Sequence, residues 1–212
     1  MHPNLNHAAI PPAVTAALIE AQDIAYALPG IELLSGLSFT LRPGLTLVRG
    51  GDGRGKTTLL RLIAGVLQPS RGTLRSRAAT LSFEQPAEPM HDAVITRAWL
   101  TARQRHHAHW QAGLAAELID AFDLTPHLDK PLYMLSTGSR RKVGWVAAAA
   151  SGAQLTLLDM PFAALDRPSC NVLTARLAKA AAQADRAWVI ADYERPEGLA
   201  GVALAGLIDL GD

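Results

Sequence analysis

The glycine-rich stretch from Gly50 to Thr58 constrains the fold of this chain more than any other feature. It fits the pattern G-x-x-x-x-G-K-[ST] and reads Gly50-Gly51-Asp52-Gly53-Arg54-Gly55-Lys56-Thr57-Thr58. A short β-rich run precedes it at residues 45–48, and leucine and isoleucine recur at helical spacing through residues 56–68. Strand, glycine loop and helix in this order predict a phosphate-binding loop.

The chemistry of the loop indicates a nucleotide. Its glycines allow the backbone to turn so that N–H groups converge on phosphate, and the helix behind it adds the positive end of its dipole. We expect Lys56 to reach the β- and γ-phosphates and the Thr57 hydroxyl to bind Mg²⁺. Asp52 is unusual, because a carboxylate beside phosphates must point away from them. The loop alone does not indicate which reaction takes place.

Composition narrows the class of protein. The 212 residues are enough for one large domain, and with 49% hydrophobic but only 5% aromatic residues the core must be largely aliphatic. Lys and Arg number 20 against 19 for Asp and Glu, so we expect no nucleic acid as partner. The single Cys170 excludes an internal disulfide. Without a secretory signal or a long apolar run, we expect a chain that is soluble or held at a membrane by a partner.

Strands and helices are expected to alternate along the chain. Residues 1–17 are predicted to form a flexible N-terminal arm, because they hold three prolines among mixed polar residues. The later pattern favours an α/β sheet that is interrupted at about residues 92–150 by a helical subdomain. Strands are expected at residues 18–25, 37–41, 73–75, 79–83, 155–159, 187–191 and 202–208, and helices at residues 56–68, 135–150 and 173–184.

A second motif narrows the class further. The stretch Leu135-Ser136-Thr137-Gly138-Ser139-Arg140-Arg141 resembles the LSGGQ signature of ATP-binding-cassette (ABC) proteins. There a serine hydroxyl and backbone N–H groups at a helix N-terminus suit a γ-phosphate. Other motifs follow in the family's order over residues 18–212. Gln85 resembles the Q-loop glutamine, residues 155–159 resemble the Walker B strand, and residues 161–166 resemble the D-loop.

The resemblance implies a P-loop NTPase fold of ABC type: α/β, with a central, mostly parallel sheet, an antiparallel β part and an inserted helical subdomain. It implies that ATP and Mg²⁺ are the cofactors and that Thr57, Gln85 and Asp159 hold the metal. Ser136 and Gly138 would serve the site of a second ABC ATP-binding domain, either a copy of this chain or a different one. Tyr26 would stack on adenine, although its spacing is unusual and packing on the sheet is an equal alternative.

The same resemblance implies transmembrane ABC subunits as partners, which would hold the chain peripherally on the cytoplasmic face of the inner membrane. Chain length and the Pro-Phe-Ala-Ala-Leu-Asp sequence at residues 161–166 are most similar to haem-exporter ATP-binding subunits of cytochrome c maturation.

Three positions depart from the family pattern, and the first is Ser139, which ends the signature where the family favours a glutamine. Walker B is followed by Met160 where the family has a glutamate, and a thioether is neither acid nor base. The H-loop histidine is also missing. The best placement puts Tyr193 at that position, and a register shifted by one residue would put Asp192 or Glu194 there instead. We predict that the chain binds ATP and closes on it but hydrolyses it slowly. Sequence drift with full activity is the alternative.

Other functions compete with transport. The replacements at Met160 and Tyr193 favour a regulatory or scaffold protein that uses ATP as a structural ligand, whereas the retained signature and D-loop favour the transporter subunit. A small-molecule kinase would gain nothing from the signature. The cluster His106, His107 and His109 admits a shared metal, but a solvated, partly basic helix face is the favoured interpretation.

Overall fold

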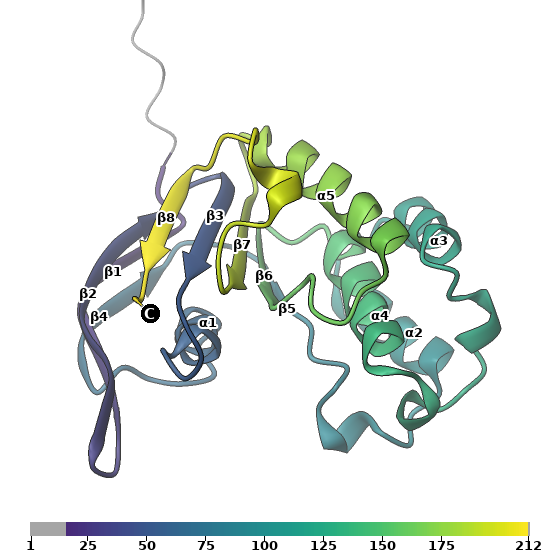
Figure 1. Cartoon of the computed structure of the whole chain (residues 1–212), viewed down its shortest axis with the longest axis horizontal. Helices are drawn as coiled ribbons and strands as arrows, with labels where there is room; N and C mark the ends of the chain where they lie inside the picture. Colours follow the sequence, from purple (N-terminus) through teal and green to yellow (C-terminus); the bar gives the residue numbers. More distant parts are fainter. Residues whose placement is uncertain (1–15, 212) are drawn as a thin grey trace, which may run out of the picture.

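The computed structural model describes residues 16–211. Its strands are β1 (Ile19–Leu28), β2 (Ile31–Leu41), β3 (Gly44–Arg49), β4 (Arg71–Ser76), β5 (Leu81–Phe83), β6 (Leu155–Asp159), β7 (Ala187–Asp192) and β8 (Gly206–Asp209). Its α-helices are α1 (Lys56–Ile63), α2 (Thr96–His106), α3 (Ala112–Ala121), α4 (Thr137–Ala150) and α5 (Arg167–Ala181) (Figure 1). The predicted arm at residues 1–17 lies almost entirely outside the described residues.

Two sheets form the β part of the molecule. A five-stranded sheet has the order β5-β6-β7-β3-β8, and its strand pairs are all parallel. A three-stranded antiparallel sheet has the order β2-β1-β4. Strand β6 is buried up to its last residue, as expected of a central strand covered on both faces. The prediction of a mostly parallel sheet with an antiparallel part is therefore confirmed.

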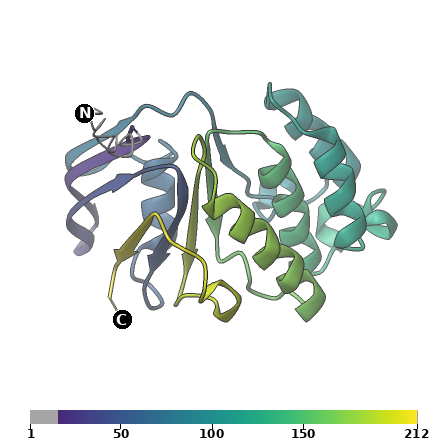
Figure 2. The same cartoon turned by 90° about the horizontal axis from the view of Figure 1, so that it is seen from above.

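The parallel sheet separates two hydrophobic cores, and the alternation of side chains along β7 shows how. Trp188 and Ile190 pack in the core shared with α4 and α5. Val189 and Ala191 belong to the other core, together with α1 and residues of the antiparallel sheet. Figure 2 shows α1 and the antiparallel sheet on one side of the central strands and the other helices on the opposite side. Each face of the sheet thus carries its own layer.

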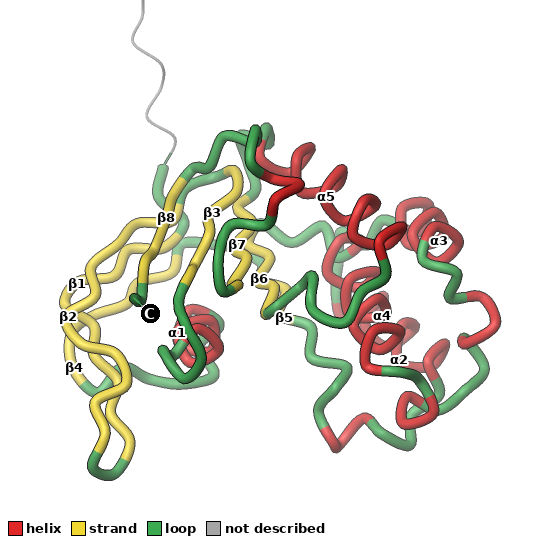
Figure 3. Tube along the Cα trace, viewed as in Figure 1, coloured by secondary structure: helices red, strands yellow, loops and turns green. Residues whose placement is uncertain are grey.

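The helical block predicted between residues 92 and 150 contains α2, α3 and α4, which lie together beyond β5 (Figure 3). Ser136 caps α4 as predicted, because its Oγ accepts a hydrogen bond of 3.1 Å from the Ser139 N–H. The buried side of α4 joins the core beneath the parallel sheet. That this block is a separate subdomain stays a prediction.

Several element boundaries differ from the sequence prediction, including the start of β2 at Ile31 rather than residue 37 and the end of α5 at Ala181 rather than residue 184, and two helix ends show the physical reason. The first helix ends at Ile63 rather than near residue 68, and Gly65 stops it with a left-handed φ of 73°. Helix α5 begins at Arg167, before the predicted residue 173. Asp166 caps it by accepting a hydrogen bond of 2.8 Å from the Ser169 N–H, and a proline lies in the first turn. The spacing of hydrophobic residues does not indicate where such a capping residue begins a helix.

A buried hydrogen bond joins the segment after β5 to the end of α2. Glu84 Oε1 lies 2.7 Å from His107 Nε2, and both side chains are 5% exposed. The same carboxylate accepts a hydrogen bond from Ser82 and faces the Arg103 guanidinium at 3.7 Å. The expectation of a solvated histidine face is therefore wrong for His107. Within residues 16–211, His, Cys, Asp and Glu form no group of three or more suited to a metal.

This pair leads to a prediction for stability. Changing His107→Ala should lower the free energy of unfolding by about 1–3 kcal/mol, because the buried Glu84 carboxylate loses its 2.7 Å partner and keeps only Ser82 and Arg103. The neighbouring His106 is exposed, so His106→Ala should change stability by no more than about 0.5 kcal/mol. Urea unfolding of both variants provides the measurement. Equal losses in the two variants would show that the buried pair contributes nothing specific.

Candidate functional site

The carboxyl ends of three parallel strands meet at one edge of the sheet. The phosphate loop follows β3, Met160 follows β6, and Tyr193 follows β7. The strand register aligns these ends, since Asp159 pairs with Ala191 and Arg49 with Asp192. One pocket collects residues from all three segments: Leu33, Asp52, Gly53, Arg54, Gly55, Lys56, Thr57, Thr58, Met160 and Tyr193. Ligands of open α/β sheets bind at this kind of edge.

The loop has the backbone geometry that its sequence predicts. Gly53 and Gly55 adopt left-handed φ values of 73° and 86°. A Cβ atom on Gly55 would lie 2.7 Å from the Leu34 side chain, so this position also needs glycine for space. Helix α1 begins at Lys56, immediately after the turn. The Lys56 ammonium is buried and donates hydrogen bonds to the carbonyls of Gly50 at 2.5 Å and Gly51 at 2.7 Å.

Thr57 and Asp159 come together as the predicted metal ligands require. The Thr57 hydroxyl donates to Asp159 Oδ2 at 2.6 Å. Asp159 Oδ1 is buried and has no hydrogen-bond partner among the described residues. A buried carboxylate oxygen with a free lone pair, next to a hydroxyl, suits a hard divalent cation such as Mg²⁺. The residues present therefore fit the metal.

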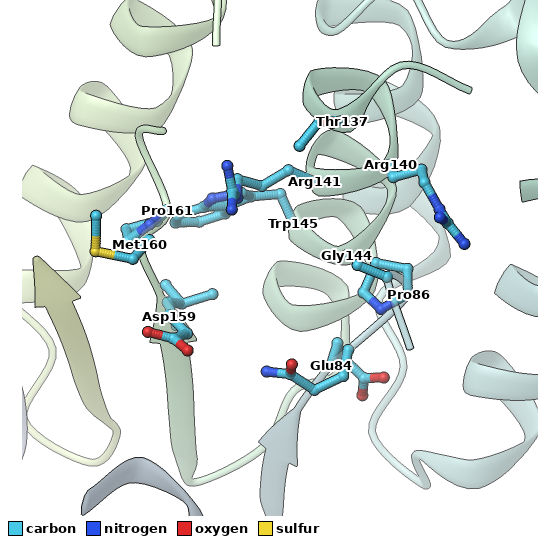
Figure 4. A pocket seen from close by; sticks show the side chains of 13 residues that line it. Glu84, Pro86, Thr137, Arg140, Arg141, Gly144, Trp145, Asp159, Met160 and Pro161 are labelled. Carbon is cyan, nitrogen blue, oxygen red and sulfur yellow. The ribbon is translucent and has the colours of Figure 1, made fainter. Parts of the chain in front are cut away.

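Gln85 belongs to a second pocket that contains the same Asp159. Its walls are the segment after β5, the exposed start of α4 and the end of β6 (Figure 4). The lining residues are Glu84, Gln85, Pro86, Ala87, Thr137, Arg140, Arg141, Gly144, Trp145, Leu158, Asp159, Met160 and Pro161. Gln85, Asp159 and Met160 thus share one hollow, and Met160 and the phosphate loop share the other.

Met160 has a strained backbone at the position of the family's glutamate. Its φ is 47°, in the left-handed region that non-glycine residues rarely adopt. Its N–H donates to the Ala191 carbonyl at 2.9 Å, which fixes the turn after β6. The thioether lines both pockets. A thioether can neither accept nor release a proton at neutral pH.

Tyr193 closes one side of the phosphate-loop pocket. Its hydroxyl donates to Asp52 Oδ1 at 2.6 Å, and the Lys56 ammonium lies 4.5 Å from the centre of its ring. The hydrogen bond to Asp52 raises the pKa of the Tyr193 hydroxyl, because it favours the protonated form. Burial raises the pKa of the neighbouring Asp192 carboxyl. The Asp52 carboxylate is thus bound to the tyrosine.

The signature stretch is held against the D-loop. Gly138 is packed so closely that a Cβ atom there would lie 2.3 Å from the Ala164 carbonyl oxygen. Arg141 donates to the Ala163 carbonyl, and Lys142 pairs with Asp166 at 2.6 Å. The lysine and the Ser169 hydroxyl hold the pKa of the Asp166 carboxyl well below its usual range. This contact fixes the start of α4.

Ser136 and Gly138 do not line the pocket of the phosphate loop in their own chain. Ser136 is exposed at the N-terminus of α4, where its Oγ also donates to Ser139 Oγ at 3.0 Å. The phosphate loop, Met160 and Tyr193 thus line one pocket, whereas Asp159 lines the neighbouring pocket together with Met160 and the start of α4.

Tyr26 lies on β1 opposite Leu34 of β2 and packs, partly buried, against the core beneath the antiparallel sheet. The pocket around the phosphate loop is lined by Leu33 and not by Tyr26. Contact of Tyr26 with adenine stays a prediction. Leu33 was missed by sequence reasoning, because an apolar residue in a strand carries no signal of a ligand.

The Gly138 contact can be tested with a matched pair of helical glycines. Gly138→Ala should lower the free energy of unfolding by about 1–3 kcal/mol, because the added methyl group must displace the Ala164 backbone. Gly113, in α3, has open space around it, so Gly113→Ala should be neutral or stabilise by up to about 1 kcal/mol. Thermal unfolding of both variants checks the signs. A stable Gly138→Ala variant would contradict this packing.

Comparisons with known proteins agree with this geometry. The model of the ABC transporter family matches residues 34–163. The cytochrome c biogenesis ATP-binding export protein CcmA of Hyphomonas neptunium is 32% identical over 167 residues, which cover 75% of this chain and 81% of the relative. CcmA of Shigella flexneri is 32% identical over 173 residues, covering 76% of this chain and 83% of the relative.

Solved structures show the same fold. An ATP-binding subunit of an ABC transporter superposes with a TM-score of 0.71 at 19% identity, covering 82% of this chain and 79% of that structure. A Pyrococcus furiosus protein described as an ABC transporter ATP-binding protein superposes with a TM-score of 0.70 at 19% identity. The match covers 91% of this chain and 96% of that structure. Family model, relatives and fold agree, and the chain belongs to the ATP-binding subunits of the ABC transporter family.

Proposed function

We propose that this chain couples Mg·ATP binding to transport by a membrane partner and that its own site hydrolyses ATP slowly. The observation that carries the proposal is the edge of the parallel sheet, where a complete phosphate loop and Asp159 meet Met160 in place of a base.

Binding uses groups that the fold already holds in place. The N–H groups of the loop and the start of α1 would bind the phosphates, and Lys56 would exchange a carbonyl partner for a phosphate oxygen. Thr57, Asp159 and Gln85 would hold Mg²⁺. When bound, the metal supplies positive charge that offsets the negative charge developing on the phosphates. Asp159 already accepts from Thr57 at 2.6 Å, so the two ligands need little rearrangement.

Hydrolysis lacks two groups that would act on the attacking water and the γ-phosphate. Met160 cannot accept the proton of that water, and loss of a general base costs about 10²–10⁴ in rate. Tyr193 can donate a hydrogen bond but does not become a cation at neutral pH. Its raised pKa keeps the hydroxyl protonated. We infer that ATP binding and closure are retained while turnover is slow.

The exposed signature supports a paired arrangement. Ser136 is exposed, and it begins a helix whose dipole favours an anion. Because Ser136 and Gly138 lie outside the pocket of their own phosphate loop, we propose that they complete the site of a second ABC ATP-binding domain. This partner is either a copy of the chain or a different cassette with an intact base.

A membrane partner is proposed from the exposed apolar side chains of two paired segments. Met90 is 77% exposed and Met134 is 58% exposed. Their segments are joined by hydrogen bonds from Leu132 N–H to the Val94 carbonyl and from Tyr133 N–H to the Asp92 carbonyl. No helix among residues 16–211 is both long and apolar enough to cross a bilayer. We propose that transmembrane ABC subunits cover this surface at the cytoplasmic face of the inner membrane.

The names of the CcmA relatives suggest a role in export during cytochrome c biogenesis, and we propose a haem-related substrate on that ground alone. A regulatory or scaffold protein that keeps ATP as a structural ligand is the second candidate, and Met160 together with Tyr193 favours it. Purification from native membranes in mild detergent separates the two. Recovery of membrane subunits supports the transporter, and their absence supports the regulatory protein.

The missing base gives a test by substitution. Met160→Glu should raise ATP turnover by about 10²–10⁴ because it supplies a carboxylate where the thioether lies. Met160→Gln is the matched control, since it has nearly the same shape but no basic group, and its turnover should stay at the wild-type level. Phosphate release by the purified chain, alone and with its partner cassette, is the measurement. Wild-type turnover of about 1 s⁻¹ or faster would contradict a slow site.

The docking surface gives a separate prediction. Met90→Asp combined with Met134→Asp should abolish recovery of membrane subunits with the chain, because a charge placed in an apolar interface must be desolvated. Val66 is equally apolar and 66% exposed, but it follows α1, so Val66→Asp should leave recovery unchanged. Quantitative mass spectrometry of the detergent extracts measures both. Unchanged recovery in the double variant would place the partner elsewhere.

A further inference from the structure

Tyr193 lies across the mouth of the phosphate loop through two contacts. Its hydroxyl donates to Asp52 Oδ1 at 2.6 Å, and its ring centre lies 4.5 Å from Lys56 Nζ. Asp52 and Lys56 belong to the loop after β3, whereas Tyr193 follows β7. The two contacts therefore connect segments that lie 141 positions apart.

These contacts involve the same Lys56 ammonium group that a bound phosphate group would contact. An ammonium group has three donors, and two of those of Lys56 go to the Gly50 and Gly51 carbonyls. The remaining side of the ammonium faces the tyrosine ring, which stabilises the cation there. A phosphate that approaches Lys56 must displace the ring or one of the carbonyls. The tyrosine is thus a competitor for the same cation.

The hydrogen bond also determines the position of a negative charge. Asp52 lies in a loop that must accept anionic phosphates, and Tyr193 is the side chain that donates to it. If the bond were broken with nothing in exchange, the released carboxylate would repel an incoming phosphate. Since the tyrosine has a single O–H donor, it cannot donate to Asp52 and to a phosphate oxygen together.

We propose that Asp52 and Tyr193 form a clasp over Lys56 that nucleotide must open, and that the clasp discriminates ATP from ADP. The γ-phosphate of ATP offers the Tyr193 hydroxyl a new acceptor when it leaves Asp52. ADP has no γ-phosphate, so the hydrogen bond between Tyr193 and Asp52 that it breaks is not replaced by another. The clasp rests on the proposed nucleotide function of the same site and adds a determinant of specificity to it.

Variants of the full-length chain test the clasp. Calorimetric titration measures the affinities for Mg·ADP and for the Mg complex of β,γ-imido ATP, which is not hydrolysed. Tyr193→Phe removes only the hydroxyl. It should tighten ADP binding by about 3- to 10-fold, because ADP no longer has to break a hydrogen bond. The ATP analogue should gain less, since it also loses its new donor. The preference for ATP over ADP therefore falls.

Asp52→Ala should tighten the binding of both nucleotides. Adding Tyr193→Phe to Asp52→Ala should leave the affinity for ADP unchanged, because the hydrogen bond between the two residues is already absent. Tyr133→Phe is the matched control. Tyr133 is 62% exposed and lies outside the phosphate-loop pocket, so neither affinity should change. Both residues of the clasp are exposed, and thermal unfolding checks that each variant is folded.

The sign of the Tyr193→Phe effect decides between two physical explanations. If repulsion by Asp52 dominates, Tyr193→Phe releases the carboxylate and ADP binds more weakly. Weaker or unchanged ADP binding by this variant overturns the clasp. The nucleotide function of the wild type is not affected by that outcome. Binding by Tyr193→Phe but not by the wild type supports a strong clasp. If no variant and no wild type binds either nucleotide, the clasp and the proposed function fail together.

Discussion

The parallel pairing of β3, β6 and β7 is the constraint on which the candidate site depends. Asp159 pairs with Ala191, and Arg49 pairs with Asp192, so three strand ends stop at the same level. A one-residue slip in a strand would move its side chains to the other face. In β6, such a slip would remove Asp159 from Thr57, which it meets at 2.6 Å. The two cores fix this register, because alternate residues of β7 are buried in different cores.

Charge at this edge is arranged in advance of any ligand. The Lys56 ammonium is buried and is satisfied by backbone carbonyls. Asp159 keeps one oxygen without a partner, although a buried polar atom of this kind is normally hydrogen-bonded. A buried carboxylate oxygen without a partner costs stability in the folded chain, and a bound Mg²⁺ would supply that partner. The loop, the start of α1 and the Asp159 carboxylate therefore belong to one site. This site indicates the function of the chain more specifically than the fold alone does.

Much of the fold and of the candidate site was predictable from the sequence, because the patterns that indicate them lie within short, contiguous stretches. The phosphate loop is a contiguous pattern whose glycines are needed for left-handed φ values and close packing, as Gly55 shows. The buried strand ending in Asp159 and the Ser136 cap are local as well. Spacing alone could not place Tyr193 against Asp52 or His107 against Glu84, because each contact depends on how distant segments meet. Helix ends were less predictable, since the Asp166 cap overrides the hydrophobic period.

The departures at Met160 and Tyr193 are connected through the structure. Both residues line the pocket of the phosphate loop, and the Met160 N–H is bonded to Ala191, two residues before Tyr193. Met160 has a strained, left-handed φ of 47°. Strain of this kind is retained only where the surrounding structure imposes it. The Met160 N–H bond to Ala191 is one such constraint, so the turn after β6 and the segment that carries Tyr193 hold each other in place beside the phosphate loop.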